Sequence, residues 1–294
     1  MHITLCDRLK INTLTILGGT MLRIATLTLA AAAFLIPAAS VSAGPIFLTG
    51  HDPDFHAQPS AGSGGNLLRE GLRFVTNGTY DDGAATKFLW VESRPVSVPS
   101  GHLRGENGLN TIGLTLGVNY DRVNAAELAS VTFGNYTAIA IASSFGGLLS
   151  RAELDGLISR SADIATFVNG GGGLFASAEC DNCGADLLGS NPDLFGYLPI
   201  DVTSIGANAP FTVTAYGSAT HGLTNGDMND PTHNSFGLTG GLNIVDTDAS
   251  GNATTLSGVV RIGGGGFTPI PEPATLALFG CALLGLGAVR RRKA

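Results

Sequence analysis

The sequence predicts an α/β domain with a mostly parallel sheet, and one βαβ unit in the middle of the chain carries most of that prediction. Tyr136–Ala142 is an unbroken apolar run, which is typical of a parallel strand buried on both faces. A helix follows it, since Ser150 and Glu153 form a capping box and an Asn-Gly pair ends the apolar pattern. Gly173–Ala178 is a second apolar run. Strand, helix and strand in this order indicate a parallel sheet with right-handed crossovers.

Apolar runs on both sides of this unit predict further elements. Asn66–Val75 spaces its leucines as the buried face of a helix. Residues 93–115 are rich in Gly and Pro and are predicted to be loop. A short helix is expected at Ala125–Phe133, and strands are expected at Pro45–Gly50, Lys87–Glu92, Phe211–Tyr216, Leu242–Asp246, Ala253–Leu256 and Val259–Ile262. The strands after residue 195 belong either to the same domain or to a small β-rich extension.

Charge excludes one class of partner. The chain has 294 residues, of which 13% are charged and 42 are Gly. Its body, residues 44–265, holds 9 Lys and Arg against 21 Asp and Glu, a formal net charge of −12. Such a surface repels nucleic acid, and the sequence has no basic stripe that would bind it. We therefore expect no nucleic-acid partner.

The first segment, residues 1–43, is predicted to be a signal peptide rather than part of the fold. Ile24–Leu35 is its apolar core, and Val41-Ser42-Ala43 is a small-residue cleavage site. The mature chain is expected to begin at Gly44. Met21 is an alternative start for the chain, and an uncleaved N-terminal anchor is the alternative to cleavage.

The last segment, residues 266–294, is predicted to be a spacer followed by a membrane segment. Ala274–Val289 carries no charge, and it is slightly shorter than the roughly 20 residues that cross a bilayer. The basic residues after it would stay on the cytoplasmic side. The parts of the tail stand in a fixed order: Pro271, Glu272 and Pro273, the apolar run, then Arg290, Arg291 and Arg292.

This order resembles the PEP-CTERM sorting signal of Gram-negative bacteria over residues 269–294. The resemblance implies that exosortase, a membrane protease-transpeptidase, recognises the Pro-Glu-Pro motif and removes a single transmembrane helix. It implies an exported protein that is tethered to the inner membrane and then moves to the cell envelope or extracellular matrix. Because the signal is associated with exopolysaccharide and biofilm formation, extracellular polysaccharide is an expected partner. The membrane is expected to contact the chain only through this helix, before processing.

The body resembles the class I glutamine amidotransferase-like fold, in its ThuA-like branch, over about residues 45–237. The resemblance rests on a helix ending in Phe-Val-Asn-Gly-Gly-Gly-Gly-Leu before a strand, on Thr49-Gly50-His51, and on His221-Gly222-Leu223-Thr224. It implies a flavodoxin-like sheet and a nucleophile elbow near Ala178 or Glu179. Neither of these side chains is a nucleophile, so the resemblance implies a domain that has lost its catalytic group.

Cys180 lies one or two positions beyond the expected elbow and forms a C-x-x-C pair with Cys183. In an exported chain such thiols are expected to form a disulfide. A redox pair is one alternative, because Cys183 precedes a helix-like segment and a helix N-terminus lowers the pKa of a thiol. A metal site and a free nucleophile are the others.

A candidate pocket follows the first strand. His51, Asp52, Asp54 and His56 lie at its carboxyl end, where ligands bind in open α/β sheets. The downstream members of the same candidate pocket are Glu179, His221, Asp230 and His233. Imidazole and carboxylate together suit Zn, Mn or Fe, although turn chemistry also explains the loop. No metal ligand is assigned.

Three functions follow from these features. The first is a non-catalytic binding or structural role in the polysaccharide matrix. The second is a metal-assisted hydrolase of carbohydrate-type substrates, which requires His51, Glu179 and His233 to converge around a divalent metal. The third is a thiol redox protein that uses Cys180 and Cys183.

Overall fold

The computed structural model describes residues 42–57, 64–94, 104–144, 148–177, 193–198, 200–228 and 234–263. The predicted signal peptide up to residue 41 and the sorting signal lie outside these residues. So do five residues with predicted site or disulfide roles, namely Glu179, Cys180, Cys183, Asp230 and His233.

No helix within the described ranges has both the length and the apolar character needed to cross a membrane.

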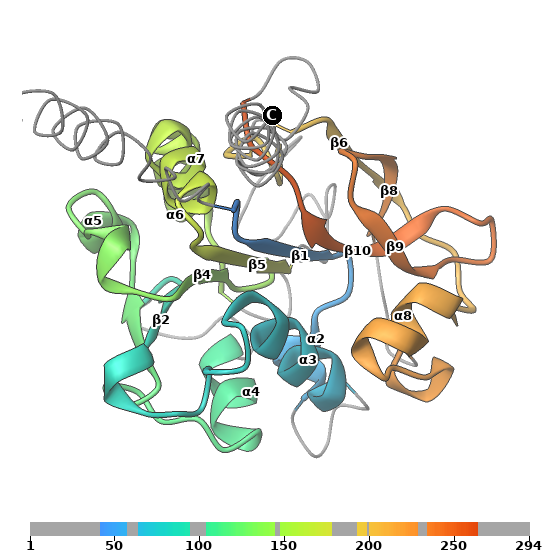
Figure 1. Cartoon of the computed structure of the whole chain (residues 1–294), viewed down its shortest axis with the longest axis horizontal. Coiled ribbons are helices and arrows are strands. Elements are labelled where there is room, and N and C mark those ends of the chain that lie inside the picture. Colours follow the sequence, from blue (N-terminus) through green and yellow to red (C-terminus); the bar gives the residue numbers. More distant parts are fainter. Residues whose placement is uncertain are drawn as a thin grey trace, which may run out of the picture. The chain divides into compact units, whose positions relative to one another are not determined.

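The described part of the body is built on one ten-stranded sheet, shown edge-on in Figure 1. Its main path has the order β3-β2-β4-β5-β1-β10-β8-β6, while β9 pairs with β10 and with β7. The strands are β1 (Pro45–Thr49), β2 (Phe88–Val91), β3 (Tyr120–Val123), β4 (Ala138–Ile141), β5 (Gly173–Ser177), β6 (Val202–Gly206), β7 (Thr212–Val213), β8 (Asn234–Thr239), β9 (Asn243–Thr247) and β10 (Ala253–Val259).

The sheet is parallel in one half and antiparallel in the other. β3, β2, β4, β5 and β1 pair in parallel, whereas β10 joins β1, β8 and β9 through antiparallel ladders. The strand order reverses between β2 and β4, which makes this position a topological switch point. A flavodoxin-like order would place the first strand between the second and third, but β1 lies between β5 and β10. The mixed α/β class is confirmed, while the flavodoxin-like order is not, and the mostly parallel sheet holds only for this half.

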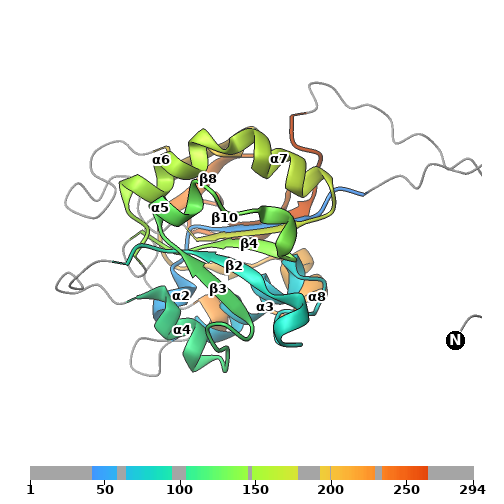
Figure 2. The same cartoon turned by 90° about the vertical axis from the view of Figure 1, so that its left-hand side faces the viewer.

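Helices cover both faces of the sheet (Figure 2). One face carries α5 (Ala125–Leu128), α6 (Arg151–Ser159) and α7 (Ser161–Asn169), and the other carries α2 (Pro53–His56), α3 (Gly65–Val75), α4 (Gly105–Thr111) and α8 (Ala215–His221). Short 3-10 turns are η1 (Ala84–Thr86), η2 (Phe133–Asn135) and η3 (Asn225–Met228). Successive residues of a strand point to opposite faces. Ile46 and Leu48 therefore pack with the α6–α7 layer, and Phe47 packs with the α3 layer.

Several predicted elements need correction. The capping box of Ser150 and Glu153 is confirmed, but the helix after it is divided into α6 and α7 at Arg160. Residues 93–115 contain α4. Phe211–Tyr216 is mostly not strand, because the Thr214 side chain accepts a hydrogen bond from Gly217 N and starts α8. The strand predicted at residues 253–256 extends to Val259 as β10, whereas residues 260–262 of the other predicted strand form no strand. The sequence pattern missed β3, β6 and β8.

The contact between α2 and α4 depends on a glycine. A Cβ added at Gly108 would lie 1.9 Å from the Asp54 carbonyl oxygen, so Gly108→Ala forces the two helices apart. We expect this substitution to lower the free energy of unfolding by about 1–3 kcal/mol in urea titrations, as overpacking does. Gly134→Ala is the matched control, because no heavy atom lies within 4 Å of the added Cβ there. Equal stability of the two variants would contradict the predicted contact.

Candidate functional site

The carboxyl ends of the parallel strands gather a set of polar residues. β1 continues through Gly50 and His51 into α2, β2 is followed by Glu92, and β4 is followed by Ser143 and Ser144. Because β1, β2, β4 and β5 run in parallel, these residues lie at the same edge of the sheet. The switch point between β2 and β4 lies at this edge too.

His51 is fully buried and pairs with a strand far along the chain. Its Nε2 lies 3.0 Å from Asp246 Oδ2 in β9, and Asp246 is also fully buried. The His51 backbone N–H donates to Thr49 Oγ1 at 3.1 Å, and the Phe211 ring meets the imidazole edge-on at 4.9 Å. This imidazole is therefore held inside the protein and is not presented to solvent.

The other residues of the predicted loop lie in α2 or at its start. His56 Nε2 lies 3.3 Å from Asp52 Oδ1, one helical turn away, and both residues are buried. Asp54 Oδ2 accepts a hydrogen bond of 2.9 Å from Ser143 N, which follows β4. Asp54 thereby ties the chain after β1 to the chain after β4.

Glu92 completes this cluster, although no site was predicted at this residue. Its Oε1 accepts from Gly105 N at 2.5 Å, and its Oε2 accepts from Trp90 Nε1 at 2.9 Å and from Glu106 N at 3.2 Å. Gly105 and Glu106 open α4, so the carboxylate satisfies helix N–H groups that have no intrahelical partner. Burial, together with the nearby charge of Asp54, raises the pKa of Glu92 to about 7, although its hydrogen bonds oppose the shift.

A second carboxylate, Glu153, links three elements on the opposite face of the sheet. Its Oε2 accepts from Ser93 Oγ at 2.5 Å, and its Oε1 accepts from Ala125 N at 2.9 Å. The capping box with Ser150 holds it at the start of α6. Glu153 is therefore a buried acid that contacts the end of β2, the start of α5 and the start of α6.

His221 lies at the end of α8, away from the His51 pair. Its Nε2 lies 2.7 Å from Ser257 Oγ in β10, and the rings of Phe47, Phe74 and Tyr216 meet it nearly edge-on. Burial lowers the pKa of His221 below its ordinary value. It therefore favours the neutral imidazole, and its Nδ1 is buried without a hydrogen-bond partner among the described residues.

Two buried hydroxyl groups lie at the carboxyl edge of the sheet, and among the described residues they lack the hydrogen bonds that the buried carboxylates make. The Oγ atoms of Ser144 and Ser177 have no hydrogen-bond partner within the described ranges. Buried polar atoms are rarely left unpaired, so ordered water is their expected partner.

The described residues bring no metal-binding group together. Within them, no set of three or more His, Cys, Asp and Glu side chains is placed to hold a metal ion. His51 pairs with Asp246 and His56 with Asp52, so the predicted loop divides into separate pairs. Convergence of His51 with Glu179 and His233 stays a prediction, since the last two residues lie outside the described ranges.

A solvent-facing hollow of about 410 Å³ lies between α3, α8 and η3. Its wall is polar: Asn66 Nδ2 donates to Asp227 Oδ1 at 2.8 Å, and Arg69 donates to Asn66 Oδ1 at 3.1 Å. Glu70, Arg73 and the end of α8 at His221 complete it. Of the predicted pocket residues that the structure describes, His221 is the one that lines this hollow.

The described chain is therefore a mixed α/β body in which buried carboxylates and imidazoles join the loops at the carboxyl edge of the sheet. Its tail identifies the wider class: residues 269–293 match the PEP-CTERM protein-sorting motif. The sorting signal is thus confirmed, and it marks an exported protein that exosortase processes.

No curated protein and no solved structure matches the chain. The resemblance of the body to the amidotransferase-like fold therefore has no support from a match.

Proposed function

We propose that the body is a non-catalytic binding module, which exosortase processing delivers to the polysaccharide-rich envelope or matrix of a Gram-negative bacterium. One observation carries the proposal. The predicted pocket residues His51, Asp52, Asp54 and His56 are buried and held by intramolecular contacts, whereas the hollow beside α3 is open and polar. An amidotransferase-like origin of the body is part of the proposal, supported by the glycine turn between α7 and β5.

The chemistry of the hollow suits a neutral saccharide. Amide, carboxylate and guanidinium groups donate to and accept from sugar hydroxyls, and Asn66, Asp227 and Arg69 supply all three. The body carries a formal net charge of −12, which disfavours an anionic polymer. We therefore expect binding to neutral polysaccharide rather than to a polyuronate.

Affinity electrophoresis of the processed protein tests this expectation, with dextran or alginate cast into the gel. Dextran is expected to retard the protein and alginate is not. Arg73→Ala is expected to weaken retention about tenfold, the effect of losing one hydrogen bond to a charged group. Arg151→Ala is the matched control, because both arginines are half-exposed and ion-paired within a helix, but Arg151 lies on the opposite face.

Two results would overturn the proposal. One is equal mobility of the protein in dextran and in polymer-free gels. The other is release of reducing ends from the polysaccharide, which would favour the hydrolase.

A further inference from the structure

The first described residues of the body are bound to the end of a helix. Gly44 N donates to Val168 O at 2.7 Å, and Val168 O also accepts from Gly171 N at 3.0 Å. Val168 lies in the last turn of α7, where the final carbonyls have no intrahelical donor and carry partial negative charge. The predicted cleavage site of the signal peptide is the bond directly before Gly44.

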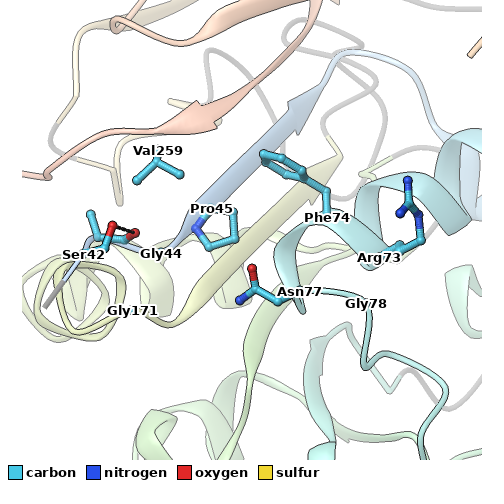
Figure 3. A pocket seen from close by; sticks show the side chains of 10 residues that line it. Ser42, Gly44, Pro45, Arg73, Phe74, Asn77, Gly78, Gly171 and Val259 are labelled. Atoms are coloured by element: carbon cyan, nitrogen blue, oxygen red, sulfur yellow. Dashed lines mark hydrogen bonds between the residues drawn. The ribbon is translucent and has the colours of Figure 1, made fainter. Parts of the chain in front are cut away.

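The surroundings of Gly44 leave no room for a side chain. A Cβ at this position would lie 1.9 Å from Gly172 O, and the preceding Ala43 is also buried. A neighbouring hollow of about 550 Å³ is lined by Ser42 and Pro45 and, at the end of α3 and just beyond it, by Phe74 and Asn77 (Figure 3). The backbone nitrogen of Gly44 is therefore positioned by the fold rather than by a flexible terminus.

We propose that signal-peptide removal converts this nitrogen into a structural ammonium group that binds the carboxyl end of α7. A signal peptidase hydrolyses the Ala43–Gly44 peptide bond with one water molecule. Ala43 leaves with the new carboxylate, and the released Gly44 amine takes up a proton at neutral pH. The hydrogen bond to Val168 O then becomes charge-assisted and acts with the helix dipole.

The same geometry sets the order of events. In the folded body Ala43 is buried and Gly44 N is bonded, so a protease reaches the bond only before this segment docks on α7. Cleavage therefore precedes docking, and it changes the hydrogen bond between Gly44 N and Val168 O from a neutral one to a charge-assisted one.

Among the described residues, Arg73 is the charged side chain that lines the hollow beside Gly44. It lies in α3 and is ion-paired with Glu70. Arg261 follows β10, whose Val259 pairs with Pro45. The charge of Arg73 is offset by its ion pair with Glu70, while the carbonyl of Val168 favours the ammonium. Because α-amino groups titrate near pH 8, the stabilisation is present below about pH 7.5 and is lost as the pH rises through the folded-state pKa.

Selective acetylation tests the proposal on the exported, exosortase-processed protein. Between residues 44 and 268 the only side-chain amine is Lys87, so a Lys87→Arg variant leaves Gly44 as the single amine. Acetylation keeps the N–H donor and removes only the charge. At pH 6.5 the unacetylated protein is expected to melt about 2–4 °C higher than the acetylated one. At pH 10 the difference is expected to vanish.

Intact mass is expected to place the amino terminus at Gly44. A different terminus, or identical melting temperatures at pH 6.5, would overturn the proposal. Retention on dextran should be the same for both forms, so this outcome is independent of the binding function.

Discussion

Asp246→Ala is expected to lower the free energy of unfolding by about 3–5 kcal/mol, the largest effect among the substitutions considered. The carboxylate lies 3.0 Å from His51 Nε2, and neither side chain is exposed to solvent. Removing it takes this contact away from an imidazole that is buried against Phe211. A buried polar group that loses a hydrogen-bond partner is left with the cost of its desolvation.

Urea unfolding at pH 7 measures this effect, and two further variants separate its causes. Asp246→Asn keeps an oxygen for His51, so a loss of about 1 kcal/mol is expected. Asp121→Ala removes a carboxylate that is 38% exposed and paired with Lys87 at 3.0 Å, and it should cost less than about 1 kcal/mol. A loss below 1 kcal/mol for Asp246→Ala would show that His51 does not depend on this pair.

The sequence pattern predicted those parts of the fold whose signals are local. The capping box of Ser150 and Glu153 and the apolar run that forms β4 lie close together along the chain, and both were found where expected. The place of β1 beside β5 and β10 depends on pairing with residues more than a hundred positions away. Nothing local in Pro45–Thr49 encodes that choice.

Two missed elements show how tertiary contacts override local preference. β3 carries Asp121 and Arg122, and two adjacent charges are not typical of a strand. In the structure, Asp121 pairs with Lys87 and Arg122 pairs with Glu106. α4 contains poor helix formers, including Gly105. It is held from outside, because Glu92 accepts hydrogen bonds from its first N–H groups.

The sequence predicted which polar residues belong to the candidate site, but it did not predict the residues that they contact. His51 and Asp54 were recognised as polar residues after a strand, whereas Asp246 and Ser143 lie 195 and 89 residues away from them. Glu92 did leave a signal, since it is a single carboxylate directly after the apolar run of β2. A charge at the carboxyl end of a buried strand is therefore as informative as a cluster of His and Asp.

Glu92 also predicts an unusual pH dependence of stability. Its pKa is raised from 4.5 to about 7, so in the folded protein the neutral acid persists to higher pH than in the unfolded chain. Above pH 4.5 the unfolded chain has released this proton and the folded protein still holds it, so stability falls as the pH rises. We expect Glu92 to lower the free energy of unfolding by about 3 kcal/mol up to roughly pH 7 and to have no further effect above it.

Urea titrations at half-unit steps of pH between 4 and 8.5 measure this slope. Glu92→Gln replaces the acid with a neutral amide and is expected to remove this decrease, while the opposite contribution of His221, whose pKa burial lowers, remains in both proteins. Asp155→Asn, on an exposed turn of α6, controls for the loss of one negative charge.

Asp248 does not contribute to this slope, because its backbone and side-chain hydrogen bonds outweigh its burial and hold its pKa below the ordinary value. Its contribution is therefore lost only at lower pH, where stability falls with acid rather than with base. A wild-type profile that already matches Glu92→Gln would mean that Glu92 stays ionised across this range.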